Sequence, residues 1–116
     1  MRRLFERVPL DVSIGDRRDD QVVIAVRGEI DSDNCAELRC ELSSALTEAG
    51  TPHVALDLSA LTFIGSAGVR ELLRCREEAE QRGGTFRITQ AHDHVRQVLT
   101  LCSLTELLHL SAAPNG

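Results

Sequence analysis

Hydrophobic and polar residues follow a pattern that changes from strand-like to helix-like several times along the chain. Two apolar stretches near the start, residues 4–14 (LFERVPLDVSI) and 21–30 (QVVIAVRGEI), predict β-strands, and the second has the dense Val and Ile of a central strand. The polar residues between them, GDRRDDQ, predict a turn. We therefore expect these two strands to pair antiparallel.

The next segment has the period of an amphipathic helix. Asn34, with Glu37 three residues later, resembles a capping box, and Gly50 with Pro52 ends the helix. One helical face is apolar and is formed by Leu38, Leu42, Ala45, Leu46 and Ala49. Residues 53–61 (HVALDLSAL) predict a buried strand. Strand, helix and strand in this order predict a right-handed crossover between parallel strands.

The second half of the chain repeats this alternation. A helix begins at Ala67, ends at Gly83-Gly84 and turns inward Val69, Leu72, Leu73 and Ala79. Residues 85–89 (TFRIT) predict a short strand. A third helix opens at His92 or Asp93 and buries Val95, Val98, Leu99 and Cys102. Residues 104–110 predict an edge strand or a turn of helix, and we expect residues 1–3 and 111–116 to be frayed.

These elements predict one α/β domain over residues 1–116, with helices packed on a mixed four- to five-stranded sheet. The hydrophobic fraction of 42% and the charged fraction of 27% suit a globular domain. A net charge of -5 argues against a nucleic-acid partner and favours a protein partner. Apolar runs such as residues 22–26 are much shorter than the roughly 18 residues of a membrane span, and MRRLFERVPL is not a secretory signal. We expect a cytosolic protein that does not bind membranes.

Cysteine and histidine side chains raise the question of bridges and metals. Cys35, Cys40, Cys75 and Cys102 contain no C-x-x-C pair, and we interpret them as reduced, mostly buried small hydrophobes. His92 and His94 lie two apart with no third ligand nearby, which is more typical of a solvated helix start around Asp93 than of a metal site. We therefore expect no metal, no stoichiometric zinc and no cofactor.

Two loops contain the candidate chemistry: GEID at residues 28–31 and IGSAG at residues 64–68. Both follow parallel strands that we expect to be neighbours, so Asp31 and Ser66 should lie close together at one edge of the sheet, where partners of open α/β sheets bind. Taken alone, Asp31 ends its strand and Ser66 is a helix N-cap. A capping hydroxyl that is exposed can also be phosphorylated, so the two readings of Ser66 are compatible.

The chain resembles the STAS domain family and, within it, the bacterial anti-sigma factor antagonists. The resemblance covers nearly the whole sequence and depends on GEID, NCAELRCELSSAL, VALDLSALTFIGSAGV, RGGTFRI and VRQVLTLCSLTELL. The central block is the most specific, because family members usually carry Asp-Leu-Ser, a few apolar residues and then Asp-Ser-Ser/Thr-Gly. The first hydroxyl after the acid is the phosphorylated one, and that position is Ser66 here.

This resemblance implies a binding protein and not an enzyme. The unphosphorylated form would capture an anti-sigma factor that is also a serine kinase and so free a sigma factor. Phosphorylation of Ser66 by that kinase would release it, and a phosphatase would reset it. We expect a monomer whose partner-binding residues are Glu29, Asp31, Asp33, Thr62, Gly65, Ser66, Ala67, Gly68 and Arg70, with Gly68 keeping the approach to Ser66 open.

Three positions depart from the family pattern. Gly65 replaces the usual acid, Ala67 replaces the second hydroxyl, and Arg70 replaces a small residue. An alternative interpretation is therefore a STAS regulatory subunit of a lipid-transport or stress-signalling assembly without a working phosphoswitch. An enzyme lacks support, because the sequence has no G-x-S-x-G frame around Ser66, no P-loop and no paired acids.

Overall fold

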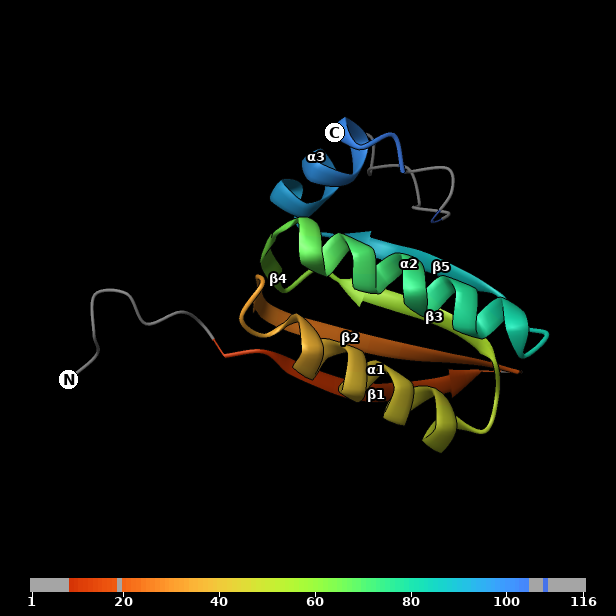
Figure 1. Ribbon diagram of the computed structural model, residues 1–116. Coiled ribbons are helices and arrows are strands. Elements are labelled where there is room, and N and C mark those ends of the chain that lie inside the picture. Colours follow the sequence, from red (N-terminus) through yellow and green to blue (C-terminus); the bar gives the residue numbers. More distant parts are fainter. Residues whose placement is uncertain (1–8, 19, 105–107, 109–116) are drawn as a thin grey trace.

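The computed structural model describes residues 9–18, 20–104 and 108. In chain order the elements are β1 (Asp11–Arg18), β2 (Gln21–Ile30), α1 (Cys35–Ala49), β3 (His53–Leu58), β4 (Leu61–Ile64), α2 (Ser66–Gln81), β5 (Phe86–Ala91) and α3 (Asp93–Leu101) (Figure 1). The sheet has the order β1-β2-β3-β5, with β4 paired to β2. The predicted fold class, one α/β domain with a mixed sheet, is confirmed. The expectations for residues 1–8 and 109–116, and most of those for 104–110, lie outside the described residues.

The first strand runs further than its sequence suggests. β1 pairs antiparallel with β2, as expected, but the pairing continues through Arg17↔Val22 and Arg18↔Gln21 after a register shift that follows Ile14. The prediction that residues 15–21 form a turn was therefore wrong for most of that segment. A strand can accommodate polar residues at an edge because the ladder bonds come from the backbone.

β2 changes partners along its length. Its residues 21–25 pair in parallel with β3, and residues 28–30 pair in parallel with β4. The strand predicted at 53–61 is thus two strands, separated where Asp57 Oδ1 accepts the Ser59 N–H at 2.9 Å. Gly28, where β4 pairing begins, has φ +104, and a Cβ there would lie 2.2 Å from the Pro9 carbonyl oxygen, so both the backbone conformation and the close approach of residue 9 require glycine.

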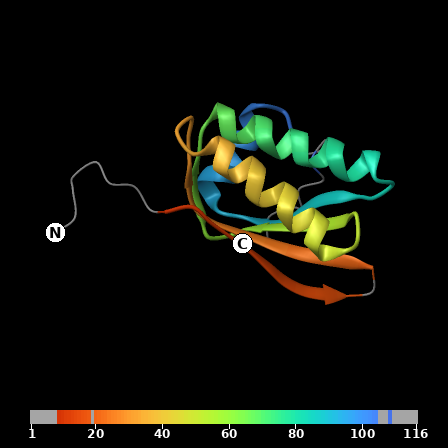
Figure 2. The same ribbon diagram turned by 60° about the horizontal axis from the view of Figure 1, so that its bottom comes forward.

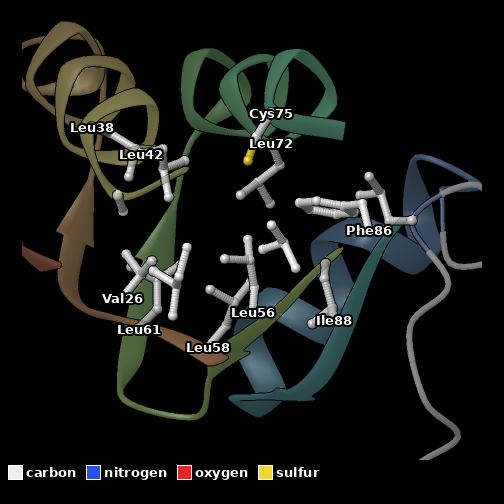
Figure 3. Close-up of a cluster of buried hydrophobic side chains, with 14 of the residues drawn as sticks. Val26, Leu38, Leu42, Leu56, Leu58, Leu61, Leu72, Cys75, Phe86 and Ile88 are labelled. Atoms are coloured by element: carbon white, nitrogen blue, oxygen red, sulfur yellow. The ribbon is translucent and has the colours of Figure 1, made fainter. Parts of the chain in front are cut away.

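α1 and α2 lie side by side across one face of the sheet (Figures 1 and 2). Figure 3 shows Leu42 of α1 and Leu72 of α2 pointing toward sheet residues such as Leu56. All five residues predicted for the apolar face of α1 are buried, as are Val69, Leu72 and Ala79 of α2. Much of the core therefore lies between these two helices and the sheet, and Val95 and Leu99 of α3, which are buried as predicted, also belong to it.

Side chains near the helix ends and on the outer faces depart from the predicted burial. Leu73 and Val98 are half-buried rather than buried. Of the four free cysteines, Cys75 is buried, whereas Cys35 is half-buried and Cys40 and Cys102 are exposed. The prediction of mostly buried cysteines was wrong, because Cys40 lies on the outer side of α1 and Cys102 lies at the end of α3. Burial raises the pKa of the Cys75 thiol to about 12.

Candidate functional site

The two loops singled out in the sequence meet at one edge of the sheet. Asp31 follows β2 and Gly65 follows β4, and these strands are parallel neighbours. The Gly65 N–H donates to the Ile30 carbonyl at 2.9 Å, and a Cβ on Gly65 would lie 3.9 Å from Asp31 Cα. The connections from β2 to α1 and from β4 to α2 accordingly lie together in Figure 1. We call residues 28–34 and 62–70 the loop edge.

The β2–α1 loop is held by hydrogen bonds between its own side chains and backbone. Asn34 Oδ1 accepts the Asp31 N–H at 2.9 Å, and Asn34 Nδ2 donates to the Glu29 carbonyl at 2.8 Å. Asp31 Oδ1 accepts the Asp33 N–H at 2.9 Å. Asn34 makes no side-chain bond to the helix, so the predicted capping box with Glu37 was wrong. The amide instead reaches back and closes the loop.

Ser66 is exposed and is the first residue of α2. The N-cap position belongs to Gly65, with φ -94 and ψ 177, and α2 begins without a side-chain capping bond. The prediction that Ser66 caps the helix was therefore wrong by one residue. Its hydroxyl lies at the positive end of a helix of 16 residues with no acidic residue in the first turn.

Gly68 is buried, and close packing around it leaves no room for a side chain. A Cβ on Gly68 would lie 2.7 Å from Ile30 Cγ2 and 2.8 Å from Ile64 Cγ1. The missing side chain lets the first turn of α2 pack directly on the ends of β2 and β4. Packing on Ile30 and Ile64 therefore accounts for the glycine at position 68, and it positions the helix start.

Gly65 is different, because nothing around it demands glycine. Its φ is negative, and a Cβ would make ordinary contacts of 3.8 Å with the Ile30 carbonyl oxygen and 3.9 Å with Phe63 Cε2. A Cβ therefore fits at this position without strain. The fold therefore does not require glycine at position 65, where STAS anti-sigma factor antagonists usually carry an acidic residue.

The other predicted partner-binding residues lie on the same edge. Thr62 is exposed, and its hydroxyl donates to the Gly28 carbonyl at 3.2 Å, which ties β4 to β2. The side chains that are half-buried at this edge are Glu29, Asp31 and Ala67, and those that are exposed are Asp33 and Arg70. A mixed acidic and basic rim thus surrounds the start of α2.

Sequence reasoning missed an aromatic pair beside Ser66. Phe63 is 41% exposed, and its ring stacks on that of His94 with centroids 5.3 Å apart and planes 15° apart. His92 caps α3, since its Nδ1 accepts the His94 N–H at 3.2 Å. Among the described residues no three His, Cys, Asp or Glu side chains are placed to hold a metal ion. At the start of α3, His92 thus caps the helix and His94 packs against Phe63.

A buried carboxylate that joins the two large helices was also missed. Glu71 of α2 is 3% exposed and accepts two hydrogen bonds from Arg39 of α1, at 3.0 Å from Nε and 2.7 Å from Nη2. Arg74 adds an ion pair at 3.2 Å. These bonds, led by those from Arg39, lower the pKa of Glu71. The tie fixes α2, and therefore Ser66, relative to α1.

Comparison with known proteins identifies the family. The model for the family described as "Mlab, STAS domain" matches residues 14–109. A protein of Bordetella bronchiseptica named as an anti-sigma factor antagonist, BtrV, is 31% identical over 86 residues, which cover 74% of this chain and 73% of that protein. Within the described residues, no helix is long and apolar enough to cross a bilayer.

Solved structures agree in fold. An anti-sigma factor antagonist from Mycobacterium paratuberculosis matches with a TM-score of 0.76 and 25% identity, over 90% of this chain and 87% of that one. The antagonist SpoIIAA in its unphosphorylated form matches with a TM-score of 0.69 and 21% identity, over 89% of this chain and 90% of that one. The phosphorylated form of the Bacillus protein SpoIIAA has also been solved, and it matches with a TM-score of 0.63. The chain belongs to the STAS domain family.

Proposed function

We propose that this chain is an anti-sigma factor antagonist controlled by phosphorylation of Ser66. The unphosphorylated form binds an anti-sigma factor that is a serine kinase, and this frees a sigma factor. The observation that carries the proposal is the exposed Ser66 at the uncapped start of α2, beside the β2–α1 loop. The name of the BtrV relative and the existence of a phosphorylated form of SpoIIAA support it.

A phosphate on Ser66 suits the helix start. Backbone N–H groups in the first turn have no intrahelical acceptor, and the helix dipole favours negative charge there. The added charge, about -1.5 to -2, therefore costs the fold little. Its effect falls on the partner, through repulsion and through the cost of burying the charge in an interface. Phosphorylation thus releases the partner without unfolding the antagonist.

The partner surface is the loop edge. Glu29, Asp31, Asp33, Thr62, Ser66, Ala67 and Arg70 provide its side chains, and Gly65 leaves space beside the hydroxyl. The protein acts in the cytosol as a monomer and by binding, without catalysis of its own. A phosphatase removes the phosphate and restores binding.

Three proteins test the proposal: wild type, Ser66→Ala and Ser66→Asp. We expect Ser66→Ala to bind the kinase permanently and to accept no phosphate, and Ser66→Asp to bind poorly because it keeps a charge at the edge. Intact-mass measurement after incubation with kinase and ATP, together with calorimetric titration, reports both properties. Phosphate on Ser66→Ala would place the acceptor elsewhere, with Thr62 and Ser59 the next candidates. The control is Ser59→Ala, in the exposed β3–β4 turn, which should be phosphorylated and should bind the kinase like the wild type.

A second candidate is a STAS regulatory subunit of a lipid-transport or stress-signalling assembly that has no phosphoswitch. Gly65 and Ala67, which replace the acid and second hydroxyl of the family pattern, favour it. Wild-type protein that binds a partner but takes up no phosphate from any co-purified kinase would favour this candidate.

A further inference from the structure

We infer that Phe63, held by His94, is the apolar anchor that the kinase partner buries when it takes up Ser66. This inference rests on the proposed function and adds the kind of pocket that the partner must offer. The anchor is an aromatic ring, so the partner presents an apolar pocket next to its catalytic cleft.

Phe63 is placed outward by β4, whose other large apolar residues face the core. Leu61 is 0% exposed and Ile64 is 2% exposed, whereas Phe63 is 41% exposed. Among the described residues the other large hydrophobic side chains that are exposed are Ile14 on β1 and Leu101 on α3. Phe63 thus combines exposure with a place on the loop edge. An aromatic ring left in water beside a binding site is typical of interface hot spots.

The distance between Phe63 and Ser66 requires that a kinase cover both. A Cβ on Gly65 would lie 3.9 Å from Phe63 Cε2, and Gly65 is bonded to Ser66. A typical interface buries about 800 Å² on each partner, a patch that extends roughly 15 Å from its centre. Because a kinase must enclose the hydroxyl and exclude water from it, its footprint centred on Ser66 includes the Phe63 ring.

His94 restrains the ring before any partner arrives. The two rings are stacked, and the His94 backbone is fixed by its N–H bond to His92 Nδ1. A side chain that is already ordered loses little conformational entropy on binding. His94 is therefore a positioning residue, and its contribution to affinity depends on the presence of the Phe63 ring.

The test measures affinity for the serine-kinase anti-sigma factor that co-purifies with the wild-type protein. We expect Phe63→Ala to weaken binding about 30-fold or more, the size of effect that defines an interface hot spot. The matched control is Leu101→Ala, which removes a side chain that is 78% exposed on α3 and should change the affinity less than about 2-fold. Urea unfolding checks that each variant folds, and Phe63→Gln, with a long polar side chain, replaces Phe63→Ala if the latter does not.

A double-mutant cycle tests the role of His94. His94→Ala should weaken binding about 2- to 5-fold in the wild-type background and should have no further effect in the Phe63→Ala background. Equal effects in both backgrounds would overturn the positioning role. If Phe63→Ala binds the kinase within about 2-fold of the wild-type affinity, Phe63 is not the anchor, but the proposed function still stands. If the wild-type protein binds no serine-kinase anti-sigma factor, the proposed function itself is wrong.

Discussion

The two connections at the loop edge are built in opposite ways. The β2–α1 loop is rich in polar side chains, and these bond to the loop backbone: Asn34 to Asp31 and Glu29, and Asp31 to Asp33. The β4–α2 connection consists of small residues, and it is positioned by the packing of Gly68 on Ile30 and Ile64. The two meet through the Gly65 N–H bond to the Ile30 carbonyl.

This contrast shows that polar side chains in a loop can maintain its shape, while the candidate phosphorylation site lies in the neighbouring connection of small residues. The side chains of Asp31 and Asn34 hold the loop's shape, because each of them bonds to its backbone. In the neighbouring β4–α2 connection, which we call the bare connection because its residues are small, no side chain caps α2, and the Ser66 hydroxyl is exposed. The β2–α1 loop is thus held by its side chains, whereas the β4–α2 connection is held by packing and leaves the Ser66 hydroxyl exposed.

The largest effect should come from filling the packed contact under the bare connection. Gly68→Val places a branched side chain where a Cβ alone already comes within 2.8 Å of two isoleucines. We expect a loss of about 3 kcal/mol in the free energy of unfolding, as for overpacked cores. Urea denaturation measures it, with Gly65→Ala as the control, because a Cβ there meets atoms no closer than 3.8 Å. Equal stability of the two variants would contradict the packing role of Gly68.

The β2–α1 loop should respond next. Asn34→Ala removes one hydrogen bond at 2.9 Å to the Asp31 N–H and one at 2.8 Å to the Glu29 carbonyl. At about 1 kcal/mol for each bond we expect a loss of about 2 kcal/mol. Asn34→Asp keeps the acceptor but turns a carboxylate oxygen toward the Glu29 carbonyl oxygen, so it should also destabilise the protein. Thermal unfolding would rule out the bracing role if both variants melted like wild type.

A smaller effect should follow from the tie between the two helices. The pKa of Glu71 lies below its usual value of 4.5, so its stabilisation is complete above about pH 4.5 and is lost as the pH falls through the folded-state pKa. Glu71→Gln removes the ion pairs with Arg39 and Arg74 and should lower the free energy of unfolding by about 1–2 kcal/mol at pH 7. The loss is not larger because both arginine side chains are about half exposed to solvent. The free energy of unfolding of Glu71→Gln should also fall less steeply than that of the wild type as the pH is lowered.

The matched control for Glu71 is Glu77→Gln, an exposed position on the same helix. Its stability should follow the wild-type curve from pH 7 to pH 3, measured by urea denaturation at each pH. If Glu71→Gln lost as much stability between pH 7 and pH 3 as the wild type, carboxylates other than Glu71 would be the cause of the loss.

Much of this architecture could be predicted from local pattern. The alternation of β2 and the apolar face of α1 are periodic signals, and the rule for parallel strands brought Asp31 and Gly65 to one edge. The break between β3 and β4 also had a signal, since Asp57 two residues before Ser59 can form a turn with its own backbone.

The rest depends on contacts between distant residues. Arg39 and Glu71 are separated by 32 positions, and they meet because α1 and α2 pack together. The outward turn of Phe63 depends on β4 pairing with β2 and on α3 supplying His94. The exposure of Cys40, in contrast, was available from the helical phase, because the buried face of α1 contains Leu38, Leu42 and Ala45 and excludes residue 40.

The smallest effect, and a stabilising one, should come from restoring the acid at the bare connection. Gly65 has the extended backbone of an N-cap, and a Cβ there fits without strain, so Gly65→Asp should cap α2 and complement its dipole. The proximity of Asp31 opposes part of this gain by like-charge repulsion, which leaves an expected increase of about 0.5–1 kcal/mol. Gly65→Asn supplies the cap without the charge. Because salt screens both the helix dipole and the repulsion by Asp31, a loss of stability of Gly65→Asp relative to Gly65→Asn in high salt would show that the dipole outweighs the repulsion, and a relative gain would show the reverse. If the carboxylate also helps the kinase to position Ser66, Gly65→Asp and not Gly65→Asn should be phosphorylated faster than wild type. A destabilised Gly65→Asp would mean that the connection is bare because the fold requires it, and the contrast between the two loops would lose its functional meaning.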